Sequence, residues 1–174
     1  LSKVADFHLN VVLGFVYTDV TEDVTVSAVT KAVEVSKDGT VVEVIYTVEF
    51  ESNFSSGPNI YNVTFKIGSG IKKLEIVEAT DSTDYGAKIA DPAFAEQFLA
   101  MSMESALAAD YDGVAGASST TAAFGATFDA LVAFHNVEYE GAAPETFEEM
   151  VARYKDEVSV KNGTFVDVTA DYDI

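Results

Sequence analysis

The residues with the clearest chemical meaning are a run of small and hydroxyl side chains just before an apolar stretch. The run reads Asp112-Gly113-Val114-Ala115-Gly116-Ala117-Ser118, and three more hydroxyls follow at Ser119-Thr120-Thr121. Apolar residues between Ala122 and Phe134 have helical spacing, so the hydroxyls precede a predicted helix. Small residues let a backbone approach a ligand, and the first amides of a helix bind phosphate. Ser118 could therefore carry a phosphate ester.

This run resembles the flavinylation motif of the FMN-binding domain family typified by the RnfG and NqrC subunits of membrane redox pumps. The family motif is usually Asp-Gly-x-Ser/Thr-Gly-Ala-Thr, and a dedicated flavin transferase joins its last hydroxyl to FMN through a phosphoester bond. Ser118 stands at that position in place of the usual Thr, and Ala115 replaces the usual Ser or Thr. The resemblance implies covalent FMN on Ser118.

The resemblance continues upstream and covers residues 58 to 138. The sequence from Ile71 to Glu78 looks like the family's strand before a Glu-Thr-x-Gly-x-Gly loop, which here reads from Asp81 to Ile89, with Asp81 and Asp84 in place of Glu and the first Gly. The two segments together imply these cofactor-binding residues: Asp112, Gly113, Val114, Gly116, Ala117, Ser118, Ser119, Thr120 and Thr121 in the motif, and Asp81, Ser82, Tyr85 and Gly86 in the loop.

Two observations near the motif leave alternatives open. Phe124-Gly125-Ala126-Thr127 also contains Gly-Ala-Thr, but it lacks the preceding aspartate and lies inside the predicted helix, so Thr127 is the weaker acceptor. Tyr85, Tyr111 and Phe124 flank the two segments, and each could stack on a flavin ring or belong to ordinary packing.

The composition limits the functions available to the chain. Its 174 residues are 48% hydrophobic, and 29 acidic against 10 basic side chains give a net charge of −19. Nucleic acids and anionic lipids bind clustered Lys and Arg, so neither is an expected partner. The chain has no cysteine, so redox chemistry would need a bound cofactor.

No transmembrane segment is expected, because no run of about 18 apolar residues occurs and Leu9 to Val16 is too short to span a bilayer. The sequence starts at Leu1 rather than Met, which favours a trimmed segment whose signal or anchor lies outside it. The resemblance to RnfG and NqrC implies an extracytoplasmic location, at the cell surface or in the periplasm.

The patterns predict an α+β fold in which helices back an antiparallel sheet and the flavin-attachment loop precedes a helix. Predicted hairpins join 33–35 to 41–46 through Lys37-Asp38-Gly39-Thr40, 61–67 to 71–77, and 158–160 to 165–168. Predicted helices run from Asp91-Pro92 to near Asp110, from Ser119 to His135 with Phe124, Phe128, Leu131 and His135 on one face, and from Thr146 to Tyr154. The expected parts are a β-rich segment at 1–57, the FMN-binding domain at 58–138, and a helix-plus-strand extension at 139–174.

Other chemistry has little support. His8 and His135 have no metal-ligand spacing and are interpreted as structural. Asp110 with Asp112, or Asp81 with Asp84, could bind calcium, but no twelve-residue calcium loop is present and a solvated acidic surface explains these carboxylates better. No nucleophile and base can be assembled from the sequence, so no catalytic residue is expected. Because no metal-ligand spacing occurs, no metal is expected either.

The favoured hypothesis is an electron carrier whose FMN, fixed at Ser118, passes electrons between partner proteins. A flavin transferase would mature it, and its redox partners include membrane-associated proteins if it works like RnfG and NqrC. The alternative is a non-redox surface or binding module with a vestigial motif. A flavoenzyme with its own substrate is a third class, but it would need a catalytic base that the sequence does not reveal.

Overall fold

The structure is a computed structural model, and it describes residues 14–81, 86–99, 101, 117–141, 146–149 and 151–152. The chain divides into two units, Leu1–Gly141 and Ala142–Ile174.

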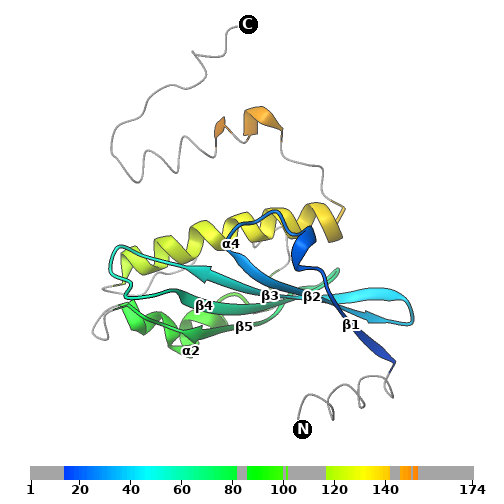
Figure 1. Cartoon of the computed structure of the whole chain (residues 1–174), viewed down its shortest axis with the longest axis horizontal. Coiled ribbons are helices and arrows are strands. Elements are labelled where there is room, and N and C mark those ends of the chain that lie inside the picture. The colour runs from blue at the N-terminus through cyan, green and yellow to red at the C-terminus, as the bar shows by residue number, and fades with distance from the viewer. Residues whose placement is uncertain are drawn as a thin grey trace, which may run out of the picture. The chain divides into compact units, whose positions relative to one another are not determined.

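One antiparallel sheet dominates the first unit (Figure 1). Its five strands follow one another in space as they do in sequence: β1 (Phe15–Asp19), β2 (Val29–Lys37), β3 (Thr40–Phe50), β4 (Asn59–Lys66) and β5 (Gly70–Glu78). A short 3-10 helix, η1 (Thr21–Asp23), follows β1. β3 pairs with β4 from Glu43↔Lys66 to Phe50↔Asn59, so a single sheet crosses residue 57, where the sequence suggested a change of segment.

Two predicted hairpins are confirmed, and turn chemistry explains the tighter one. Asp38 and Gly39 connect β2 to β3 with φ of 52° and 78°, the left-handed pair that a two-residue hairpin turn requires. β4 and β5 pair as predicted around a turn at residues 67–69. The sequence analysis missed β1, which pairs with β2. The third predicted hairpin, at 158–168, lies outside the described residues.

The long helix α4 (Ser118–Tyr139) lies along one face of this sheet (Figure 1). Its predicted apolar face is confirmed, because Phe124, Phe128, Leu131 and His135 are all fully buried. The helix begins one residue before and ends four residues after the predicted bounds. With the sheet it makes the expected α+β fold.

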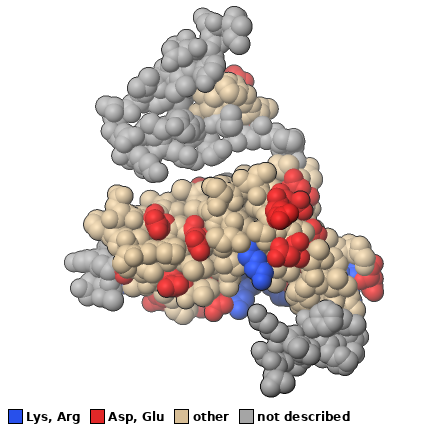
Figure 2. Space-filling model, in the orientation of Figure 1, with Lys and Arg blue, Asp and Glu red and all other residues tan. Residues whose placement is uncertain are grey.

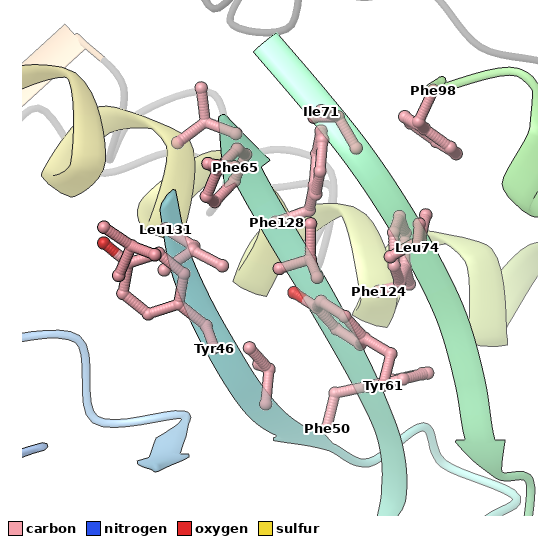
Figure 3. Packing of buried hydrophobic residues seen from close by; sticks show 14 of the residues in the cluster. Tyr46, Phe50, Tyr61, Phe65, Ile71, Leu74, Phe98, Phe124, Phe128 and Leu131 are labelled. Atoms are coloured by element: carbon pink, nitrogen blue, oxygen red, sulfur yellow. The ribbon is translucent and has the colours of Figure 1, made fainter. Parts of the chain in front are cut away.

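Aromatic rings form the contact between α4 and the sheet. In Figure 3, Phe124, Phe128 and Leu131 of α4 point toward Tyr61, Phe65 and Tyr46 of the strands. The Phe124 ring centroid lies 4.8 Å from that of Tyr61 and 5.4 Å from that of Phe128. Burying each such ring contributes roughly 1.5–3 kcal/mol. Phe124 therefore belongs to the core.

The helix predicted from Asp91 to near Asp110 starts as predicted, but the helix that begins there ends at Glu96, and residues 102–110 lie outside the described part of the chain. Asp91 caps α2 (Pro92–Glu96) by accepting the Ala93 amide at 2.9 Å. Beyond Glu96 the amides of Phe98 and Leu99 bond three residues back rather than four, and the Met101 carbonyl accepts the Ile71 amide of β5 at 3.2 Å. This long-range bond draws the chain to the sheet edge and away from a helical path.

In the second unit, a reciprocal capping box begins the predicted helix. The Thr146 amide donates to Glu149 Oε2 at 2.8 Å, and the Glu149 amide donates to Thr146 Oγ1 at 3.2 Å. This arrangement satisfies two amides that a helix start leaves unpaired. Residues 147–149 and 151–152 are helical, so the predicted start is confirmed.

Near the carboxyl end of α4, His135 lies in the core. Its Nδ1 is 3.0 Å from the Tyr46 hydroxyl, and its ring lies 4.4 Å from that of Phe65. Burial lowers the pKa of His135 from 6.5 to about 4. The nearest carboxylate oxygen, Glu140 Oε1, lies 3.5 Å from Nε2, which is too far for a strong hydrogen bond. His135 is therefore neutral in the folded protein at pH 7.

This burial predicts a loss of stability in mild acid. Below pH 6.5 the unfolded chain takes up a proton on His135 that the folded chain refuses until about pH 4. The free energy of unfolding should fall across this window by an amount on the order of 3 kcal/mol. In His135→Gln, which does not titrate, that part of the slope should disappear in urea titrations between pH 7 and 4. An unchanged slope would assign the loss to other groups.

Candidate functional site

A buried carboxylate, that of Asp81, holds together three segments at one end of the sheet. Asp81 is 4% exposed. Its Oδ1 accepts from Ser55 Oγ at 2.5 Å and from Asn59 Nδ2 at 2.9 Å, and its Oδ2 accepts from Ser52 Oγ at 2.6 Å and from Thr120 Oγ1. Ser52 and Ser55 belong to the β3–β4 loop, Asn59 begins β4, and Thr120 lies in the first turn of α4. One side chain therefore fixes the loop and the helix relative to each other.

The hydrogen bonds to Asp81 also settle its ionisation. Burial on its own would raise the pKa of Asp81, but the bonds from Ser52, Ser55, Thr120 and Asn59 outweigh it and lower the pKa to about 2. The carboxylate is thus charged at neutral pH. It lies beside the positive end of the α4 dipole, where a negative charge is stabilised.

Gly86 is the glycine of the predicted flavin-binding loop that starts at Asp81. It packs against the Asp81 carboxylate. A Cβ added to Gly86 would overlap Asp81 Cβ and would lie 2.8 Å from both Asp81 Oδ2 and Thr120 Oγ1. Gly86 begins the short helix η2 (Gly86–Ala90) and is itself buried. Only glycine lets this backbone approach the Asp81–Thr120 pair so closely.

The first turn of α4 presents one exposed hydroxyl. Ala117 is the N-cap residue, with no side-chain capping bond, and the first helical bond runs from the Thr121 amide to the Ala117 carbonyl at 2.9 Å. Ser118 is exposed and Ser119 is half-buried, whereas Thr120 and Thr121 are 2% and 8% exposed. Ser118 is the first helical residue rather than the residue ahead of the helix. Its hydroxyl reaches solvent beside amides that have no acceptor within the helix.

The competing hydroxyl of Thr127 is already bonded. Thr127 Oγ1 donates to the Phe124 carbonyl at 2.9 Å and lies 3.0 Å from the Tyr61 hydroxyl. Because this side chain is half-buried in the middle of α4, a phosphate ester there would break both contacts. The geometry favours Ser118 over Thr127 as an acceptor.

The structure thus brings together part of the predicted site. Asp81, Gly86 and Thr120 are in contact, and Ala117, Ser118, Ser119 and Thr121 belong to the same helical turn. The remaining predicted residues lie outside the described part of the chain: Asp112, Gly113, Val114, Gly116, Ser82 and Tyr85. Sequence reasoning missed Ser52, Ser55 and Asn59, to which it assigned no role at the site. The Ser-rich composition of residues 52–56 is the signal that hydroxyl donors were available there.

No protein-family model matches the sequence, and no curated protein matches it. Within the described residues, no helix is long and apolar enough to cross a membrane, and no three His, Cys, Asp or Glu side chains gather as a metal site would need. A functional hypothesis therefore rests on the motif and on the geometry around Asp81.

The close contact at Gly86 predicts that adding one methyl group there lowers the stability of the fold substantially. In Gly86→Ala the new Cβ must displace Asp81 or Thr120, so we expect a loss of about 2–4 kcal/mol in the free energy of unfolding. Gly57→Ala is the matched control, since its Cβ would meet only Thr80 Cγ2 at 3.8 Å. Chemical denaturation of both variants tests this. Equal stability of the two would mean that Gly86 is not tightly packed.

The lowered pKa of Asp81 predicts a second, more acidic stability window. Its charged form stabilises the fold above the unfolded pKa, near 3.8, and this contribution is lost as the pH falls toward the folded pKa of about 2. The loss should be on the order of 2 kcal/mol. Asp81→Asn should be less stable at pH 7 and should lack this acid-dependent step. Asp38→Asn, at an exposed turn, removes the same charge and should keep the step; a step retained in Asp81→Asn would contradict the assignment.

Proposed function

We propose that this protein is an electron carrier that holds FMN through a phosphoester bond to Ser118. The observation that carries the proposal is the contact between Asp81 and Thr120. It joins the two segments that resemble the flavin-binding motifs of the RnfG and NqrC family, which lie 39 residues apart in the sequence. Ser118 is exposed two residues from that contact, as an acceptor for a bulky nucleotide must be.

The surface beyond Ser118 fits a flavin attached there. Ala122 and Ala126 follow at intervals of one helical turn and are exposed on the same side of α4. Their small side chains leave the surface beside Ser118 open to a bulky group. The amides of the first turn would bind the ester phosphate, which carries negative charge.

Formation of the ester requires an activated flavin, because a phosphate monoester does not condense with a hydroxyl in water. A flavin dinucleotide supplies the activation in its pyrophosphate bond. Ser118 Oγ would lose its proton and form the bond to the phosphorus of the FMN half, the pyrophosphate P–O bond would break, and AMP would leave with the electron pair. A separate flavin transferase provides the catalysis, and this chain provides the acceptor.

Once attached, FMN would supply the one- or two-electron chemistry, and the protein would hold and orient it. On the face shown in Figure 2, Asp and Glu side chains are spread widely and Lys side chains are few, in keeping with the net charge of −19. Such a surface favours encounter with a basic redox partner. We place the carrier outside the cytoplasm, among partners that include membrane-associated proteins.

The central test is the mass of the intact protein after co-expression with a flavin transferase. Wild type should gain the mass of FMN less one water, and the label should remain after denaturation. Ser118→Ala should gain nothing, because it removes the acceptor oxygen. Ser118→Thr should be labelled, since threonine is the usual acceptor in the family, and Thr127→Ala should be labelled like the wild type.

The same experiment separates the competing hypotheses. An unlabelled wild type, under conditions that label a known member of the family, would favour the non-redox binding module. Label that survives in Ser118→Ala would move the acceptor to another hydroxyl of the turn, of which Ser119 is the most exposed.

A further inference from the structure

The β3–β4 loop, residues 51–58, carries the most exposed large hydrophobic side chain in the described part of the chain. Phe54 is 70% exposed. The loop reads Glu51-Ser52-Asn53-Phe54-Ser55-Ser56-Gly57-Pro58, with a single charge at its start. A single exposed aromatic ring does not by itself indicate a binding site. The evidence for a role comes from how the loop fixes the position of Phe54.

The loop is fixed rather than loosely extended. The Phe54 amide donates to Ser52 Oγ at 3.1 Å, and Ser52 Oγ in turn donates to Asp81 at 2.6 Å. On the other side of the ring, Ser55 Oγ also donates to Asp81, and Ser56 Oγ donates to the Thr80 carbonyl at 2.8 Å. Residues on both sides of Phe54 are therefore tied to the chain around Asp81, and the ring projects from a rigid support.

This support leads directly to the first turn of α4. Hydrogen bonds in series connect the Phe54 amide to Ser52, Ser52 to Asp81, and Asp81 to Thr120. In Figure 1 the β3–β4 loop, α2 and the amino end of α4 gather at one end of the unit, and the β2–β3 hairpin lies at the opposite end. The exposed ring and the exposed Ser118 hydroxyl therefore belong to the same end of the molecule.

We propose that the β3–β4 loop forms a wall of the flavin site and that Phe54 contacts the isoalloxazine ring. This inference rests on the proposed function. The five-carbon ribityl chain carries the isoalloxazine well beyond the ester phosphate, so the ring of a flavin on Ser118 must lie against a neighbouring segment or in water. Phe54 offers it a large apolar face on a fixed loop, and offset or edge contact between aromatic rings is worth about 0.5–1.5 kcal/mol beyond the burial of area. Phe124 cannot serve, because it is fully buried in the core.

The decisive experiment uses tryptophan as a contact quencher, since an indole touching an isoalloxazine quenches its fluorescence by electron transfer, whereas phenylalanine does not. In flavinylated protein, Phe54→Trp should lower the flavin fluorescence several-fold. Tyr17→Trp is the matched control: Tyr17 is 50% exposed on β1, where it pairs with Val35 near the β2–β3 hairpin, and it should leave the fluorescence unchanged. Phe54→Trp and Tyr17→Trp are also made in a Tyr85→Phe background. Tyr85 belongs to the predicted flavin-binding loop, and a tyrosine there could quench the flavin and hide the quenching by Trp.

A loss-of-contact variant gives an independent measurement. Phe54→Ala should be fully flavinylated, as judged by intact mass. Its flavin fluorescence anisotropy should fall, because the isoalloxazine ring rotates more freely without its contact. Phe54→Tyr should restore the anisotropy. Full flavinylation with unchanged fluorescence in Phe54→Trp and unchanged anisotropy in Phe54→Ala would overturn this inference and leave the proposed function intact. A wild type without flavin would overturn both.

Discussion

One buried carboxylate organises the end of the molecule where function is expected. The oxygens of Asp81 accept hydrogen bonds from the β3–β4 loop, from the start of β4 and from the first turn of α4. An ionised group pays a large desolvation cost on burial unless its lone pairs are satisfied, and here four neutral donors satisfy them. The conformation of three segments is therefore coupled to the ionisation of a single side chain.

The helix α4 is held differently along its length. At its amino end, Thr120 is fixed by Asp81. In the middle, the rings of Phe124 and Phe128 pack on the strands. At its carboxyl end, His135 meets Tyr46, and Glu140 accepts the Gly68 amide from the β4–β5 turn. Apolar packing supplies most of the stabilisation, whereas the polar contacts at the two ends determine the position and register of the helix on the sheet.

The sequence predicted those parts of the fold that depend on local chemistry. Asp38-Gly39 specified a hairpin turn, Asp91-Pro92 specified a helix start, and the spacing of Phe124, Phe128 and Leu131 specified a buried face. The apolar spacing after Asp91 did not predict where α2 ends, because that depends on the bond between Ile71 and Met101. Nor did it predict that Ser52 and Ser55 bond to Asp81, which lies 29 and 26 residues away. Partners so far apart in the sequence leave no periodic signal, and only the resemblance suggested that the Asp81 loop and the α4 turn meet.

The permanent charge on Asp81 has a consequence for how tightly a flavin could be held. With a pKa of about 2, Asp81 remains an anion wherever the protein functions, and it adds to a net charge of −19. Both would repel the dianionic phosphate of free FMN and oppose the attraction of the helix amides. If Ser118 carries FMN as proposed, a covalent ester would keep the flavin in place against this repulsion, because occupancy would not depend on the concentration of FMN in the surrounding fluid.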